Sequence, residues 1–294
     1  MALMRCCVFA HFDQQDIVDP YVLGYLDALI PLVDKLVFVS TSQLNQSDLE
    51  RLFQRGIDVI CRENFGYDFY SWKVGLDALN LDDYDEFLQV NDSCYAPLFD
   101  LDAIFETMEK SDCDFWCMTQ SYFYNRHAQS YFVCYKSAAL NNPAFRQFWK
   151  DLAPIEDKKQ LIVAYEVGIS RILIRERLKM ESYFKVSLGS YLRVLPRNLK
   201  LKISVTRNFN PYKYLRAMLL SNPPFHFYQE MLAQKVPLIK ISLIKGIPFS
   251  TPPTNLLSVD GINFATIRLI YNHQKRIGSS CYAELWIPPD KIDE

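Results

Sequence analysis

The stretch from Val59 to Pro97 constrains the fold of this chain more than any other. Its apolar runs and polar loops alternate in the order strand, loop, helix, strand, loop. The first polar loop spans residues 62–68 and reads Arg-Glu-Asn-Phe-Gly-Tyr-Asp, and the second is the triplet Asn91-Asp92-Ser93. Because ligands of open α/β sheets bind beyond the carboxyl ends of the strands, we expect the two loops to meet at one end of one sheet.

The same alternation runs through residues 1–136 and predicts an α/β fold. The sheet should be mostly parallel and twisted, with helices on both faces. Strands are expected at Met4–Phe12, Lys35–Ser40, Ile57–Cys61, Glu86–Val90, Asp114–Thr119 and Ser130–Tyr135. Helices are expected at Tyr21–Leu32, Ser47–Gln54, Phe69–Leu79, Pro97–Lys110, Pro143–Trp149 and Lys159–Leu178. We assign residues 1–183 to this domain and residues 184–294 to a C-terminal extension of mixed helices and loops, with a helix at His226–Ala233 and a short strand at Leu238–Leu243.

The composition excludes several classes of protein. Half of the residues are apolar, which excludes a disordered chain. The eight cysteines include no Cys-x-x-Cys pair, so we expect reduced, buried thiols rather than disulfides or a zinc site. The N-terminus reads as a first strand rather than a signal peptide, and no apolar run approaches the ~18 residues of a membrane span. We therefore expect a cytoplasmic protein.

The charge is unevenly distributed along the chain, although the net charge is only −2. Residues 1–157 carry a net charge of −14, residues 158–216 carry +11, and residues 217–294 carry +1. A basic segment that follows an acidic domain favours an anionic partner, such as phospholipid headgroups or a pyrophosphate. The alternative is a solvated helix face with ordinary ion pairs. Nucleic acid is disfavoured because no nucleic-acid-binding motif accompanies the charge.

Several sequence strings occur in a fixed order along residues 5–245. They are Asn64–Lys73 (NFGYDFYSWK), Val90–Leu98 (VNDSCYAPL), Asp114–Trp116 (DFW), His127–Phe132 (HAQSYF) and Tyr165–Ile169 (YEVGI). Together with the opening Val8–Asp13 and the late Val236–Lys240, they resemble the rhamnan synthesis F family. The resemblance implies a GT-A-like fold that binds a nucleotide-sugar. It also implies a bacterial glycosyltransferase of surface polysaccharide assembly, such as lipopolysaccharide and its O-antigen, with dTDP-rhamnose or another nucleotide-sugar as the donor.

The triplet Asn91-Asp92-Ser93 stands where a GT-A site usually has two carboxylates that hold a divalent metal. Only Asp92 is acidic here. Because Mg²⁺ can be held by one or two carboxylates together with substrate phosphates, Asp92 can still serve as a ligand for Mg²⁺ or Mn²⁺. Asn91 and Ser93 would then contact phosphate or ribose. The alternative is a simple turn, since Asn, Asp and Ser are common turn residues.

The loop at residues 62–68 is the second candidate for donor binding. Gly66 allows a positive φ or a close backbone approach to a ligand, and Asp68 can accept hydrogen bonds from ribose or base. Arg62 or Lys73 can offer charge to phosphate. The alternative is that Asp68 only caps the following helix. The full set of predicted donor-binding residues is His11, Arg62, Asn64, Gly66, Tyr67, Asp68, Lys73, Asn91, Ser93 and Gln129.

Glu166 is the predicted general base, with Asp92 and His127 as further catalytic residues. Glu166 lies within an otherwise apolar run, where a carboxylate is costly unless it is paired or faces a cleft. In an inverting transfer it would take the proton of the acceptor hydroxyl. The alternative for Glu166 is a structural ion pair with Arg62, Arg126 or Arg171. The alternative for His127 is a loop histidine with satisfied hydrogen bonds.

Three classes of function remain open from the sequence. The leading class is an inverting glycosyltransferase that acts on a polysaccharide or lipid-linked glycan acceptor, peripheral on the inner face of the cytoplasmic membrane. The second is a nucleotide-sugar- or polysaccharide-binding protein that has lost catalysis, which the single carboxylate of the triplet favours. The third is another nucleotide-dependent enzyme, which the absence of GxGxxG and GxxxxGK[ST] motifs disfavours.

Overall fold

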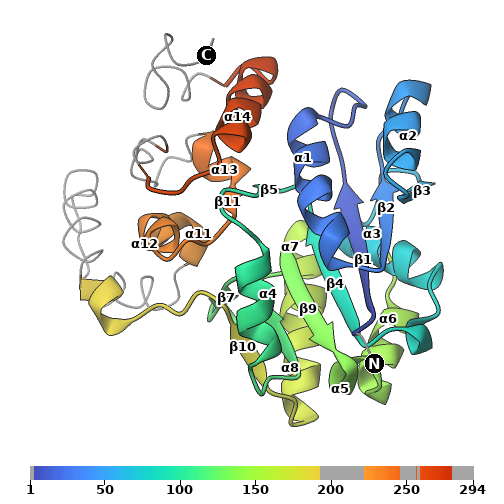
Figure 1. The fold of residues 1–294 in the computed structure, drawn as a ribbon. Coiled ribbons are helices and arrows are strands. Elements are labelled where there is room, and N and C mark those ends of the chain that lie inside the picture. The colour runs from blue at the N-terminus through green and yellow to red at the C-terminus, as the bar shows by residue number, and fades with distance from the viewer. Residues whose placement is uncertain (1–2, 193–221, 246–255, 257–258, 280–294) are drawn as a thin grey trace.

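A seven-stranded sheet forms the centre of the computed structural model, which describes residues 3–192, 222–245, 256 and 259–279 (Figure 1). The strand order is β10–β6–β9–β4–β1–β2–β3. All neighbours pair in parallel except β9, which runs antiparallel to both β4 and β6. The strands are β1 (Arg5–His11), β2 (Lys35–Ser40), β3 (Asp58–Cys61), β4 (Glu86–Asn91), β6 (Phe115–Cys117), β9 (Phe132–Lys136) and β10 (Met180–Ser182). The expected α/β class with a mostly parallel sheet is confirmed.

Helices cover both faces of this sheet, and β1 shows why. Every residue of β1 is buried, which is the pattern of a strand with a core on each side. Cys7 and Phe9 point into one core, and Cys6 and Val8 point into the other. The helices of this part of the chain are α1 (Pro20–Leu29), α2 (Gln46–Phe53), α3 (Tyr67–Asp77), α4 (Asp102–Glu109), α5 (Ser137–Leu140), α6 (Pro143–Asp151), α7 (Lys158–Leu161) and α8 (Val167–Arg175).

The described residues after 221 pack on the same core as the first strands. The elements are α11 (Pro223–His226), α12 (Tyr228–Ala233), β11 (Ile239–Lys240), α13 (Ile241–Ile244) and α14 (Phe264–Arg276). Strand β11 pairs antiparallel with the short β5 (Cys94–Tyr95), and α14 lies beside α1 (Figure 1). Buried side chains of α12 and α14 belong to the cluster that contains Phe9. The boundary at residue 183 stays a prediction. In the described residues, no helix combines the length and apolarity needed to cross a bilayer.

Several predicted element boundaries were wrong for physical reasons. The predicted helix Lys159–Leu178 is interrupted by a π-helical turn at Ile162–Glu166, so its apolar spacing belongs to two α-helices and a bulge. The predicted helix at Pro97 begins only at Asp102. The predicted strand Leu238–Leu243 turns into α13 after Lys240.

The loop at residues 62–68 also differs from the prediction in detail. Helix α3 begins at Tyr67, because Gly66 takes a positive φ of 69° at the cap position. Asp68 therefore does not cap the helix with its side chain, and it is free to bond elsewhere. Strand β3, which precedes the loop, is an edge strand with half-exposed residues rather than a buried one. By contrast, Asp19 caps α1 ahead of Pro20 as the sequence indicates.

Candidate functional site

A cleft of about 760 Å³ opens beyond the carboxyl ends of β1 and β4. Asp68, at the start of α3, and the triplet Asn91-Asp92-Ser93 both line it. The two loops are in direct contact, since Asn91 Nδ2 donates to Asp68 Oδ2 at 2.8 Å. The expectation that they meet at one end of the sheet is confirmed. Asp68 thus serves to join two loops rather than to cap a helix.

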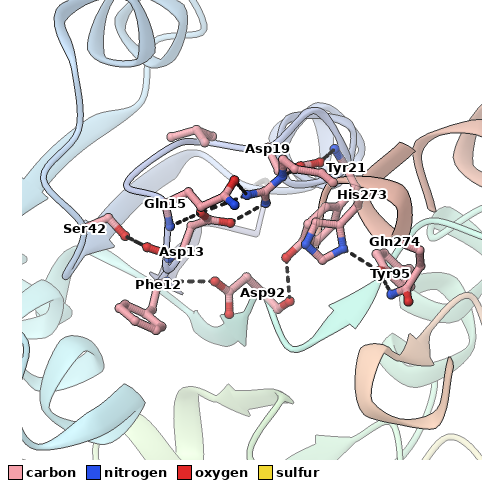
Figure 2. Close-up of polar contacts among 12 residues, drawn as sticks. Phe12, Asp13, Gln15, Asp19, Tyr21, Ser42, Asp92, Tyr95, His273 and Gln274 are labelled. Atoms are coloured by element: carbon pink, nitrogen blue, oxygen red, sulfur yellow. Dashed lines mark hydrogen bonds and ion pairs between the residues drawn. The ribbon is translucent and has the colours of Figure 1, made fainter. Parts of the chain in front are cut away.

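The carboxyl of Asp92 is fixed by the loop that follows β1. The backbone N–H of Phe12 donates to Asp92 Oδ2 at 2.8 Å, and Tyr21 donates to the backbone oxygen of Asp92 at 3.2 Å (Figure 2). Burial, and then repulsion from Asp68, raises the pKa of Asp92 to about 8. Both effects disfavour a lone negative charge, so the carboxyl will favour a proton or a bound cation.

The oxygen atoms at this place fit a divalent metal such as Mg²⁺ or Mn²⁺. Asp92 and Asp68 both present carboxyl groups to the cleft, and hard cations bind such oxygens. Among the described residues, no group of three or more Asp, Glu, His or Cys side chains could hold an ion alone. An ion here would need donor phosphates as its remaining ligands, and it would supply positive charge to the leaving diphosphate.

Glu166 lines the same cleft and is held by two side chains. Its Oε2 accepts from Ser130 Oγ at 2.9 Å, and its Oε1 lies 3.3 Å from His127 Nε2. It is the last residue of the π-helical turn, a feature frequent at functional sites. In the described part of the chain Glu166 therefore pairs with His127 rather than with an arginine.

The imidazole of His127 lies behind the carboxylate of Glu166. Its Nδ1 is 2.8 Å from the carbonyl oxygen of Asn125, which can only accept, so Nδ1 carries a hydrogen. Its Nε2 is on the side of Glu166, 3.3 Å from Oε1. His127 is buried and does not line the cleft. It therefore acts on Glu166 from behind.

The sequence of this chain matches a known protein family. The model of the family described as "Rhamnan synthesis protein F" matches residues 36–191, just over half of the chain. The chain belongs to the rhamnan synthesis protein F family. Virulence protein VirA of Vibrio anguillarum is 27% identical over 232 residues, which are 74% of this chain and 71% of that protein. The uncharacterized protein y4gN of Sinorhizobium fredii is 28% identical over 142 residues, 46% of this chain and 37% of that one.

Solved structures resemble the chain at low identity. A glucosyl-3-phosphoglycerate synthase of Mycobacterium tuberculosis with Mn²⁺ and UDP-glucose gives a TM-score of 0.39 at 11% identity, over 69% of this chain and 78% of that one. A 4-diphosphocytidyl-2C-methyl-D-erythritol synthase of Anaerococcus prevotii gives 0.39 at 10% identity, over 61% and 86%. At these scores the likenesses carry no argument about the reaction of this family member.

The structure of this rhamnan synthesis F chain separates the predicted site residues into two groups. The predicted residues that line the cleft are Tyr67, Asp68, Asn91, Asp92, Ser93, Gln129 and Glu166. The predicted residues that do not line it are His11, Arg62, Asn64, Gly66, Lys73 and His127. In the second group, His11 is the last residue of β1, Arg62, Asn64 and Gly66 belong to the loop at residues 62–68, and Lys73 lies within α3.

Three members of the second group show what they do instead. The guanidinium of Arg62 donates to Ser71 and to backbone carbonyls of residues 63, 65 and 67, so it holds the loop in shape. Lys73 pairs with Asp77 one turn along α3. His11 lies beneath the cleft with Nδ1 2.9 Å from Ser40 Oγ, and burial lowers its pKa to about 4. None of the three lines the cleft, and their donor-binding roles stay predictions.

The sequence analysis missed the cations that line the cleft, which are Lys158, Lys240, Lys245 and Arg276. Lys240 belongs to the string Val236–Lys240 that resembles the family, but the sequence assigned it no function. Arg276 gave none: it pairs with Asp13 at 2.5 Å and with Asp19 at 2.9 Å from the other end of the chain. Figure 2 shows Asp13 and Asp19 in the loop between β1 and α1, the loop whose Phe12 amide holds Asp92.

Proposed function

We propose that this chain is an inverting glycosyltransferase that moves a sugar from a nucleoside-diphosphate donor to a growing surface polysaccharide or lipid-linked glycan. The observation that carries the proposal is the arrangement of one cleft: the Asp68–Asn91–Asp92 cluster on one side and Glu166, backed by His127, on another. Membership of a family described by rhamnan synthesis supports a polysaccharide product. We propose rhamnose or a related deoxysugar, carried by dTDP, as the donor.

The reaction assigns a separate task to each side of the cleft. The acceptor hydroxyl attacks the anomeric carbon, its proton passes to Glu166, and the bond from that carbon to the diphosphate oxygen breaks. The electron pair of that bond leaves with the diphosphate. Asp92, with a divalent metal, would hold the diphosphate side. His127 and Ser130 orient the Glu166 carboxylate, so that one oxygen faces the incoming hydroxyl.

A nucleotide-binding screen tests the proposal directly. The melting temperature of the purified protein is measured with dTDP, UDP, GDP and CMP, each with and without Mg²⁺ or Mn²⁺, because a ligand of the folded state raises it. We expect a clear rise with one nucleoside diphosphate, larger with metal, and loss of the metal effect in Asp92→Asn. No rise with any nucleotide would contradict the proposal. Binding without transfer or donor hydrolysis would favour an inactive nucleotide-sugar-binding protein.

We propose in addition that the basic segment beginning at Lys158 rests on the anionic inner face of the cytoplasmic membrane, where a lipid-linked acceptor lies. Lys158 lines the cleft, so a surface bound here would lie close to the site. Leu188 is 77% exposed in the same segment and can enter the headgroup region. Residues 193–216 of the segment lie outside the described residues. Co-sedimentation with anionic liposomes should exceed that with neutral ones, and equal binding would refute this part.

A further inference from the structure

Four side chains from three separate parts of the chain form one line of hydrogen bonds beside Asp92. Lys240 Nζ donates to Ser93 Oγ at 2.7 Å, and Ser93 Oγ donates to Asn91 Oδ1 at 2.6 Å. Asn91 Nδ2 then donates to Asp68 Oδ2 at 2.8 Å. Every donor points the same way, from the ammonium to the carboxylate. Bonds aligned in this way polarise one another, which strengthens the line as a whole.

The backbone around Lys240 fixes its ammonium at this place. Strand β11 pairs with β5, which puts Lys240 opposite Cys94, and the N–H of Ile241 donates to the carbonyl of Ser93 at 3.1 Å. The ammonium also lies 4.1 Å from the centre of the Tyr131 ring, a favourable cation–π contact. The Lys240 side chain is therefore held against the triplet Asn91-Asp92-Ser93 rather than extended into solvent.

The charges around this line are arranged to receive an anion next to the carboxylates. Lys158, Lys240 and Lys245 line the cleft together with Asp68 and Asp92. The charges of Lys240 and Lys158 partly offset the rise that burial causes in the pKa of Asp68. An ammonium has three donors, and Ser93 takes one from Lys240. A doubly charged group that enters the cleft finds a fixed cation beside the single carboxylate of the triplet.

We propose that Lys240 binds the diphosphate of the donor and stabilises the negative charge that the diphosphate gains when the bond to the sugar breaks. This inference rests on the proposed function and deepens it. Lys240 would then add positive charge from the C-terminal part of the chain. A metal ion held by a single carboxylate would neutralise the diphosphate only in part. The site then selects a nucleoside diphosphate over a nucleoside monophosphate, because only the second phosphate reaches the ammonium.

Substitution of Lys240 tests the assignment by binding rather than by activity. Titration calorimetry measures the affinity of the nucleoside diphosphate found in the screen, and of the matching monophosphate, with and without Mg²⁺. For Lys240→Met we expect the diphosphate affinity to fall roughly tenfold to a hundredfold, the scale of a lost charged hydrogen bond. The monophosphate affinity should change less than about threefold. Lys240→Arg should keep most of the preference.

Two further variants make the test decisive. Lys240→Gln keeps a donor for Ser93 without the charge, and it should lose the preference for the diphosphate even if Lys240→Met does not fold. Lys150→Met makes the same change at an exposed position of α6 outside the cleft, and it should bind like the unaltered protein. Unaltered diphosphate affinity in the Lys240 variants would overturn the inference and leave the proposed function standing. Failure of the unaltered protein to bind any nucleoside diphosphate would overturn both.

Discussion

At the scale of single residues, Glu166 lines the cleft and is paired with His127, which lies behind it. The side chain of Glu166 is 18% exposed and reaches the cleft, whereas that of His127 is 4% exposed and is enclosed by protein. Ser130 donates a hydrogen bond to the second carboxylate oxygen, so the carboxylate of Glu166 is held in one orientation. A proton acceptor held in one orientation is what general base catalysis needs, because the acceptor hydroxyl must be reached in one geometry.

Replacement of Glu166 by glutamine tests the proposed base. We expect Glu166→Gln to lower kcat for sugar transfer by a factor of ~10²–10⁴, since the amide fills the same space but cannot accept the proton. Nucleoside-diphosphate binding should be nearly unchanged, because Glu166 does not act on the donor phosphates. Glu176→Gln, an exposed change at the end of α8, serves as the control. Steady-state kinetics and calorimetry would contradict the role if transfer stayed intact.

His11 gives the folded protein a pH dependence that can be measured. Burial lowers its pKa to about 4, whereas an unfolded chain has a histidine pKa of ~6.5. The folded state thus binds the proton more weakly. Above pH ~6.5 His11 is neutral in both states and costs no stability. As the pH falls from ~6.5 towards 4, only the unfolded chain takes up the proton, and the free energy of unfolding decreases by about 3 kcal/mol. Urea denaturation should show a steeper acid loss for the unaltered protein than for His11→Gln, and parallel curves would refute this explanation.

At the scale of elements, the apolar periodicity of the sequence predicted most strands and the mostly parallel sheet because those signals are local. The π-helical turn at Ile162–Glu166 was invisible, since one extra residue barely disturbs the apolar spacing of a helix. Lys240 and Ser93 are 147 residues apart, and Arg276 and Asp13 are 263 apart. No spacing rule relates such positions. The sequence therefore predicted the carboxylate side of the cleft and missed its cations.

The packing of α3 against β1 depends on one glycine. A methyl group at Gly75 would overlap the side chain of Val8 and press on Val39. Both neighbours are buried, so neither can move aside easily. We expect Gly75→Ala to lower the free energy of unfolding by ~1–3 kcal/mol, as overpacking does. Because α3 carries Asp68 at its first turn, the change should also weaken nucleotide binding.

A double-mutant cycle shows whether overlap with Val8 is the cause. In the Val8→Ala background the added methyl finds space, so Gly75→Ala should cost clearly less than it does alone. Chemical denaturation of the four proteins measures the coupling. Additive losses would place the cost in the helix backbone or at Val39 instead.

At the scale of the whole molecule, α14 joins the C-terminal part to the loop that builds the site. Gln274 donates to the hydroxyl of Tyr95 at 2.5 Å, and His273 Nδ1 lies 2.5 Å from the same oxygen (Figure 2). Arg276 pairs with Asp13 and Asp19 at the two ends of the loop between β1 and α1. That loop supplies the Phe12 amide that holds Asp92. The cleft is thus complete only when residues far apart in sequence are packed together.

Removal of the Arg276 side chain should weaken the attachment of α14 to the loop between β1 and α1. Arg276→Ala leaves the largely buried carboxylate of Asp19 without its cation, so we expect a loss of about 2–3 kcal/mol in the free energy of unfolding. Lys275→Ala, an exposed change next to it, should stay within ~0.5 kcal/mol. Nucleoside-diphosphate affinity should fall with Arg276→Ala, because the loop that positions Asp92 is less ordered. If urea denaturation showed the two variants to be equally stable, α14 would be attached by its apolar face alone, and Arg276 would be free to serve the donor instead.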